Sequence, residues 1–220
     1  MADTTQSAKQ SVFQKPLVRV VILIIGLGLL VSGIVKIFNS GDKTKVSDEF
    51  INKFNQVLSL SNEIASGKTL TETLAPLPEK DQAKDYSGAA KILSEAVDQL
   101  NGWKSKTNQL KGLFIELKDL SRQITDTDVK TSALELVDLM DQRADLFLAV
   151  MADQLSLLSP TKTYYENLAA GKKAVPLPDQ QIAAVNARIN SEVERMNQLI
   201  ETINKKQEDF AKLAGISVSK

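Results

Sequence analysis

Two residue types are missing from this chain of 220 residues: it contains no cysteine and no histidine. Without cysteine there is no disulfide, no thiolate ligand for zinc and no thiol nucleophile. Without histidine there is no imidazole metal ligand and no histidine-based catalytic triad. The 220 residues also lack the cysteine to which a bacterial lipoprotein attaches its lipid. These absences exclude a large share of enzyme and metal-site chemistry.

Residues that favour turns and sheets are scarce, with 10 glycines, 6 prolines and only 5% aromatic residues. This composition favours helices over sheets. The hydrophobic content of 43% and the charged content of 25% are typical of a chain that can bury a core. Basic and acidic residues balance at 27 each, and both signs are mixed along the chain. A surface of this kind offers no basic patch for nucleic acid, which we therefore do not expect as a partner.

The strongest single signal is an apolar run over residues 17–38, LVRVVILIIGLGLLVSGIVKIF. As a helix, these 22 residues extend about 33 Å, enough to cross a hydrocarbon core of about 30 Å. A buried core helix this apolar would need protein on every side. A cleavable signal peptide would need a small-residue cleavage site, which VSGIVKIFNSG matches poorly. The sequence therefore predicts an uncleaved transmembrane helix that contacts the lipid bilayer through residues 17–38.

The charges around this span leave its orientation nearly balanced. Three basic residues precede its apolar centre and three follow it: Lys9, Lys15, Arg19, Lys36, Lys43 and Lys45. A short polar tail followed by a large domain resembles a signal anchor, because long domains translocate largely regardless of charge. We therefore expect residues 1–16 to be a disordered cytoplasmic tail. A hydrophilic linker, residues 39–46, would then lead to an extracytoplasmic domain.

Residues 47–215 carry apolar residues at intervals of three and four, the spacing of helices that bury one face. Helix signals divide this region into segments: Ser47 to Gly67, Ala83 to Ile124, Thr127 to Leu158, and Asp179 to Gly215. Ser47, Thr127 and Asp179 are the expected N-caps, and Leu213 lies on the apolar seam of the last segment. The second segment has the most regular stripe: Tyr86, Ala89, Leu93, Ala96, Leu100, Trp103, Thr107, Leu110, Phe114, Leu117, Ser121 and Ile124. The pattern predicts an all-α fold, an elongated antiparallel bundle of about four long helices. Trp103 is expected in its core.

Between the third and fourth segments, Ser159-Pro160 permits two interpretations. Serine followed by proline can start a fresh helix, which would end before Gly171. Alternatively, Pro160 can kink one longer helix.

One phrase occurs twice, once before each of two long helices. IASGK at residues 64–68 resembles LAAGK at 168–172, and PLPE at 76–79 resembles PLPD at 176–179. We expect each glycine to take a left-handed turn at a helix end, and each Pro-Leu-Pro to hold the chain extended. The repeat indicates either two duplicated helical hairpins or convergent use of helix-end residues. The last residues, 216–220, are expected to form a loose tail.

No catalytic, cofactor-binding or metal-binding residues are predicted. Gly67-Lys68-Thr69 resembles the end of a P-loop but lacks the upstream glycine. Residues 126–130, DTDVK, begin like a calcium loop and lack its glycine and closing glutamate. Glu192 lies on an apolar seam, where we expect it at the edge of the core. An enzyme is not expected, because no nucleophile and base are placed together.

These observations favour a membrane-anchored, non-catalytic helical bundle that acts in protein–protein interaction or as a cell-envelope scaffold. Its helix faces would bind a protein partner or a second copy. The alternative is an extracytoplasmic ligand-sensing bundle, similar in outline to chemoreceptor sensor domains. Such receptors need a second transmembrane span, and no second run of about 18 apolar residues exists in the sequence.

Overall fold

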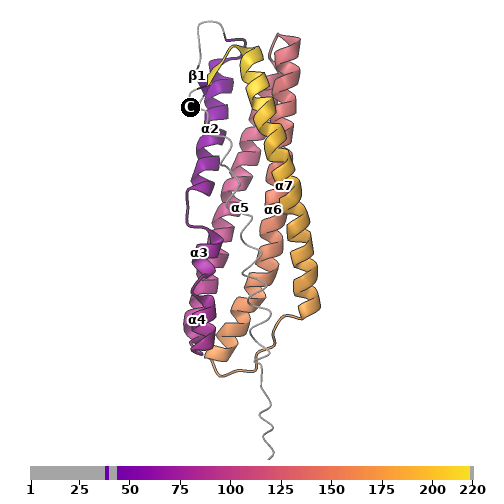
Figure 1. Cartoon of the computed structure of the whole chain (residues 1–220). Helices are drawn as coiled ribbons and strands as arrows, with labels where there is room; N and C mark the ends of the chain where they lie inside the picture. Colours follow the sequence, from indigo (N-terminus) through magenta and orange to yellow (C-terminus); the bar gives the residue numbers. More distant parts are fainter. Residues whose placement is uncertain (1–37, 40–43, 219–220) are drawn as a thin grey trace, which may run out of the picture.

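The computed structural model describes residues 38–39 and 44–218, which form an elongated helical bundle (Figure 1). Four helices are long: α2 (Asp48–Ala65), α5 (Tyr86–Arg122), α6 (Thr127–Ala169) and α7 (Asp179–Ala214). Two short helices, α3 (Leu70–Leu74) and α4 (Leu77–Gln82), continue the column that α2 begins. The expected all-α bundle is confirmed. The longest helix, α6, has 43 residues and extends about 65 Å.

The predicted transmembrane helix lies outside the described residues, except for its last residue, Phe38. Within the described part, no helix is both long enough and apolar enough to cross a membrane. Phe38 belongs to a short strand, β1 (Phe38–Asn39), and not to a helix.

Neighbouring columns of the bundle run antiparallel. Helix α6 packs against α5 on one side and α7 on the other, while α2, α3 and α4 pack against α5. Between α2 and α5, Lys53 pairs with Glu116 and Glu63 pairs with Lys106, so the residue numbers run in opposite directions. The rings of Phe50 in α2 and Phe210 in α7 lie 5.5 Å apart and close the bundle at one end.

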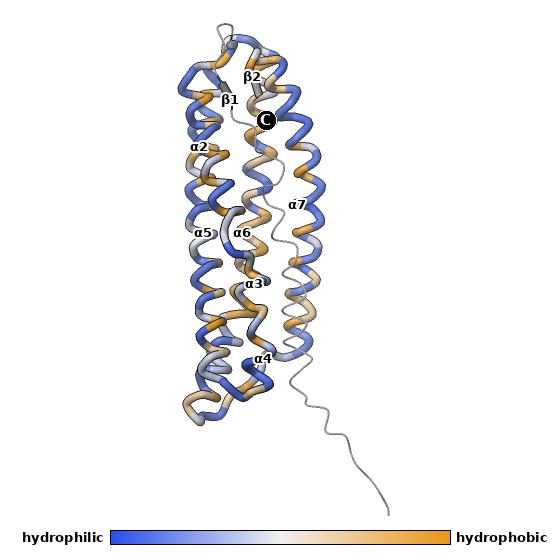
Figure 2. Tube along the Cα trace, turned by 60° about the vertical axis from the view of Figure 1, so that its left-hand side comes forward, coloured by the Kyte–Doolittle hydropathy of each residue, from blue (hydrophilic) through white to orange (hydrophobic). Residues whose placement is uncertain are grey.

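The core consists of the predicted stripes. Ten residues of the predicted stripe are buried: Ala89, Leu93, Ala96, Leu100, Thr107, Leu110, Phe114, Leu117 and Ser121 in α5, and Ile124 just after it. Hydrophobic residues recur along every long helix, with hydrophilic residues between them (Figure 2). Trp103 packs against Phe147 of α6, with ring centroids 6.4 Å apart, but it is half-buried and so lies at the edge of the core and not inside it. Leu213, expected on the seam of α7, is instead 41% exposed near the helix end.

Helix termini follow the sequence signals at some positions and depart from them at others. The Ser47 hydroxyl accepts a hydrogen bond from the Phe50 amide and caps α2, as predicted. Gly171 and Gly215 have φ values of 65° and 68°, the left-handed turn expected of them. Gly67 does not, although it lies two residues after the end of α2, as Gly171 does after the end of α6.

Two predicted caps are shifted by one residue. Asp126, and not Thr127, caps α6 by accepting bonds from the amides of Asp128 and Val129. Asp179 does not cap α7, because Pro178 holds the N-cap position without a side-chain bond. Asp179 lies in the first turn, where its charge favours the positive end of the helix dipole.

The repeated phrase folds in two different ways. The second copy behaves as predicted, since residues 172–178 are irregular and exposed Val175 lies among them. The first copy does not stay extended: Thr69 and Glu72 form a reciprocal capping box that starts α3, and Pro78 lies in the first turn of α4. Proline is tolerated there because the first turn needs no amide donor. Leu77 is 1% exposed, so this leucine packs against the bundle.

Helix α6 continues through Pro160, so the longer of the two predicted helices is present and no fresh helix begins at Ser159. An internal proline removes one backbone hydrogen bond and costs about 3 kcal/mol. Beyond it, Tyr164 and Tyr165 are buried against the end of the bundle. Their packing offsets that cost.

The two ends of the described chain meet at one end of the bundle. Strand β1 pairs antiparallel with β2 (Ser217–Val218), and Ile216 is 7% exposed. The Lys45 amide donates to the Ala214 carbonyl, and the Lys45 ammonium pairs with Asp126 at 2.8 Å. Residues 216–218 are therefore not the loose tail that the sequence suggested. Because the chain enters the bundle at this end, α4 and the 170–178 connection form its far end (Figure 1).

Candidate functional site

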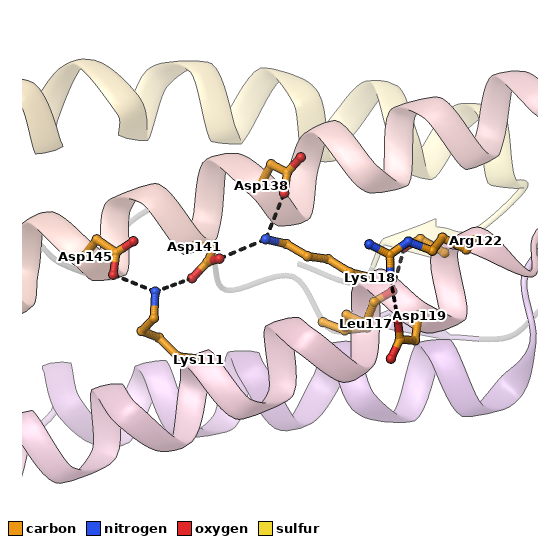
Figure 3. A network of polar contacts seen from close by, with 9 residues as sticks. Lys111, Leu117, Lys118, Asp119, Arg122, Asp138, Asp141 and Asp145 are labelled. Atoms are coloured by element: carbon orange, nitrogen blue, oxygen red, sulfur yellow. Dashed lines mark hydrogen bonds and ion pairs between the residues drawn. The ribbon is translucent and has the colours of Figure 1, made fainter.

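Three aspartates of α6 lie in an ion-pair ladder between α5 and α6 (Figure 3). The Lys111 ammonium lies 2.7 Å from Asp141 and 2.5 Å from Asp145. The Lys118 ammonium lies 2.8 Å from both Asp138 and Asp141. Asp141 thus pairs with two lysines that lie seven residues, or about two helical turns, apart on α5. These two pairs favour one register of α5 against α6.

The charges in this ladder stabilise one another. Burial alone would raise the pKa of Asp141, but the hydrogen bonds from Lys111 and Lys118 outweigh it, so the pKa lies below its ordinary value. Burial would lower the pKa of both lysines, and their bonds to aspartates raise it instead. Lys111, Lys118 and Asp141 therefore stay charged at neutral pH. They have no proton to exchange there, which makes the ladder a structural element and not an acid–base site.

Within the described residues, no group of three or more aspartates or glutamates is placed to hold a metal ion. Glu192 lies half-buried at the edge of the core, in the position the sequence suggested. Burial, together with the charge of Asp153, raises the pKa of Glu192.

The bundle interior contains a small cavity between α2, α5, α6 and α7. Its volume is about 50 Å³, and Phe114, Phe147 and Ile203 form part of its apolar wall. Arg143, 6% exposed, contributes a charged group, and burial lowers its pKa to about 10. A space of this size accommodates water molecules, whereas drug-sized ligands need roughly 300–1,000 Å³.

All three tyrosines of the chain gather at the far end of the bundle. The Tyr165 hydroxyl donates to the Asp81 carboxylate at 2.8 Å and so joins α6 to α4. Burial, and then this bond to Asp81, raise the pKa of Tyr165 far above its ordinary value. The rings of Tyr164 and Tyr165 meet edge to face at 5.3 Å, and both residues are buried. The cluster is therefore packing that holds α4 in place, and it offers no open aromatic face for stacking a ligand.

A wider concavity lies on the outside of the bundle, between α2 and α5. This α2–α5 groove has a volume of about 450 Å³ and opens to solvent. The two glutamates at its ends are Glu116, paired with Lys53 at 2.6 Å, and Glu63, paired with Lys106 at 3.1 Å. Gly112 of α5 lines it midway. The periodicity of the sequence did not predict this groove, because its lining depends on how α2 and α5 lie side by side.

One family model accounts for most of the chain. It is named YkyA, its description reads "Putative cell-wall binding lipoprotein", and it matches residues 56–213. The chain belongs to the YkyA family. No curated protein and no solved structure matches the chain.

The YkyA match covers the bundle from within α2 to within α7, including every residue that lines the α2–α5 groove. It does not include residues 17–38. The family description names binding to the cell wall and no reaction, which agrees with a non-catalytic, envelope-associated helical protein.

Proposed function

We propose that this protein is a membrane-tethered rod of the cell envelope that binds the cell wall without catalysing a reaction. Membership of the YkyA family carries the proposal, because the family description supplies both the envelope location and the wall-binding activity. The bundle suits this role: it is long and narrow, and several of its charged side chains form ion pairs that join neighbouring helices.

The tether would be the polypeptide itself. The family is described as lipoproteins, yet these 220 residues contain no cysteine to carry a lipid. Residues 17–38 are apolar and long enough to cross a bilayer, and they lead directly into β1 at one end of the bundle. The opposite end would then reach about 60 Å from the membrane, since α6 runs along the rod.

The ligand-sensing alternative has less support. A sensor for a small metabolite needs an enclosed site of several hundred Å³. The interior cavity in the described part of the bundle has about 50 Å³.

Co-sedimentation tests wall binding directly. The full chain, purified in mild detergent, is mixed with purified peptidoglycan sacculi and centrifuged. We expect the protein to pellet with the sacculi in a saturable manner and to stay in the supernatant without them. Protein that remains in the supernatant at every sacculus concentration would contradict the proposal.

A single substitution tests the tether. Arginine at the middle of a transmembrane helix costs about 2.5–3.5 kcal/mol on insertion scales. We therefore expect Leu27→Arg to shift the protein from the alkali-resistant membrane fraction toward the soluble fraction. Full retention of Leu27→Arg in the washed membranes, or release of the unaltered chain, would argue against a spanning helix.

A further inference from the structure

We infer that the α2–α5 groove is the site at which this protein binds wall material, and that its ligand is a neutral glycan chain carrying hydroxyl and amide groups. This inference rests on the proposed wall-binding function and adds to it a place and a ligand class. The groove is shallow and open to solvent, and its volume of about 450 Å³ leaves room for a short stretch of a polymer lying along the surface.

The direction of the groove suits a chain-like ligand. Its two ends are marked by the Lys53–Glu116 and Lys106–Glu63 ion pairs, which lie ten residues apart on each helix. Ten residues of helix extend about 15 Å. The groove is open along this length, so a linear polymer can lie in it without threading through the protein.

The charge of the groove favours a neutral ligand. The carboxylates of Glu63 and Glu116 are the acidic groups that line it, and each is paired with a lysine at its edge. The pairs leave the groove without net charge. An anionic polymer or a basic peptide would gain no electrostatic attraction there. The binding of a neutral carbohydrate does not depend on such attraction.

The remaining lining offers hydrogen bonds and a small apolar surface. The Gln56 and Gln109 amides each supply donors and an acceptor, and the Ser59 hydroxyl supplies both. In the described part of the chain these three side chains are exposed and make no hydrogen bond to protein. Leu60 and Leu113 lie among them, half-buried. Sugars present this combination, with polar edges and an apolar C–H face.

Gly112 keeps the groove open. It lies in the interior of α5, where glycine costs about 1 kcal/mol relative to alanine. No atom of the protein lies within 4 Å of the position that a Cβ would occupy, so packing within the bundle does not require glycine here. A larger side chain at this position would project into the groove and occupy the space that a bound ligand would fill.

Gly102 provides a matched control. It lies in the same helix, is equally exposed, and has nothing within 4 Å of its own Cβ position. It does not line the groove. Leucine should be accepted at both positions, and it should stabilise the helix in both cases by about 0.8–1 kcal/mol. A difference in binding between the two variants therefore reports the groove and not the fold.

The test compares the full chain in mild detergent with its Gly112→Leu and Gly102→Leu variants. Calorimetric titration with a soluble β-linked N-acetylglucosamine oligosaccharide measures glycan binding, and sedimentation with sacculi measures wall binding. We expect the unaltered chain and Gly102→Leu to bind both alike. Gly112→Leu should bind the oligosaccharide about tenfold more weakly or not at all, a loss of at least about 1.4 kcal/mol.

Each other outcome would overturn the inference in its own way. Equal oligosaccharide binding by Gly112→Leu and Gly102→Leu would show that the oligosaccharide does not bind in the groove. Sacculus binding without oligosaccharide binding would assign the wall contact to stem peptides or anionic polymers, while the proposed function stands. Failure of the unaltered chain to bind either probe would refute both the inference and the proposed function. Circular dichroism of each variant checks that its helices are intact.

Discussion

Replacing Asp141 by asparagine should lower the free energy of unfolding of the bundle by about 1–2 kcal/mol. Asp141 accepts hydrogen bonds from Lys111 at 2.7 Å and from Lys118 at 2.8 Å, across the α5–α6 interface. Its side chain is 22% exposed, and those of the lysines are 31% and 23% exposed. The substitution keeps the shape of the side chain and removes the charge that both ammonium groups contact.

The magnitude follows from the partial burial of the pairs. A hydrogen bond to a charged group contributes about 1.5–3 kcal/mol when it is well buried, while an exposed ion pair contributes about 0–1 kcal/mol. Two pairs of intermediate exposure therefore contribute more than one surface pair. The full sum is not lost, because Lys111 keeps Asp145 and Lys118 keeps Asp138.

The effect must also depend on pH with a definite sign. The pKa of Asp141 is lower in the folded protein than its ordinary value of 3.8, so folding favours the charged form. Its stabilisation is fully present above the pKa of the unfolded chain and is lost as pH falls through the lower folded-state pKa. The difference between the native chain and Asp141→Asn should therefore be constant between about pH 5 and pH 8 and shrink below about pH 4.

Urea unfolding of the full chain in mild detergent, followed by circular dichroism at pH 7 and at pH 3, measures both effects. Asp119→Asn serves as the control, because Asp119 pairs with Arg122 at the surface, where the side chains are 62% and 64% exposed. We expect the control to change stability by less than about 0.5 kcal/mol. Equal losses for the two variants, or a loss from Asp141→Asn that persists undiminished at pH 3, would refute the reasoning.

Three further substitutions follow from the packing, and the same urea titration measures each of them. Phe50→Ala removes a fully buried ring that contacts Phe54 and Phe210, and it should cost about 3–5 kcal/mol; a cost below 1 kcal/mol would mean that this end of the bundle is not packed. Gln154→Leu should stabilise the protein by about 1–2 kcal/mol, because the Gln154 amide is 3% exposed and has no hydrogen-bond partner in the described part of the bundle. A less stable Gln154→Leu variant would mean that the amide does have a hydrogen-bond partner. Gly215→Ala should cost about 1–2 kcal/mol because φ is 68° at this position, and unchanged stability would contradict the left-handed turn.

The bundle itself could be predicted because its cause is local and periodic. An apolar residue at every third or fourth position buries one face of a helix, and residues such as Leu93, Leu100 and Phe114 are buried where that rule places them. Gly171 and Gly215 end their helices in the predicted left-handed turn, since only glycine adopts it without steric cost.

The errors arise where tertiary contacts or neighbouring residues decide between local alternatives. Pro160 permits a break, but the burial of Tyr164 and Tyr165 beyond it holds α6 in one piece. The two Pro-Leu-Pro segments look alike, yet only the first follows a capping box, formed by Thr69 and Glu72. That box was readable in the sequence as Thr-x-x-Glu and would have predicted α3.

The candidate site was the least predictable feature. The α2–α5 groove forms where small residues such as Ser59 and Gly112 lie beside larger side chains on two neighbouring helices. The periodicity of a single sequence does not give the distance between helices. Its lining residues, such as Gln56 and Gln109, look like any exposed polar positions until the register of α2 and α5 is known. Gly112 is a helix-weakening residue inside a long helical pattern, but Gly102 of the same helix is too and does not line the groove, so glycine alone did not mark the place.

In the proposed arrangement, the bundle stands on the outer side of the membrane and is held there by residues 17–38. Because the chain has no cysteine, single cysteines can map its topology without background. Val175 is 74% exposed in the connection at the far end of the bundle, and Ser7 precedes the predicted span. In intact cells, a membrane-impermeant maleimide should label the Val175→Cys chain and leave the Ser7→Cys chain unlabelled until the cells are permeabilised. Labelling of Ser7→Cys alone, or of neither chain before permeabilisation, would contradict the account.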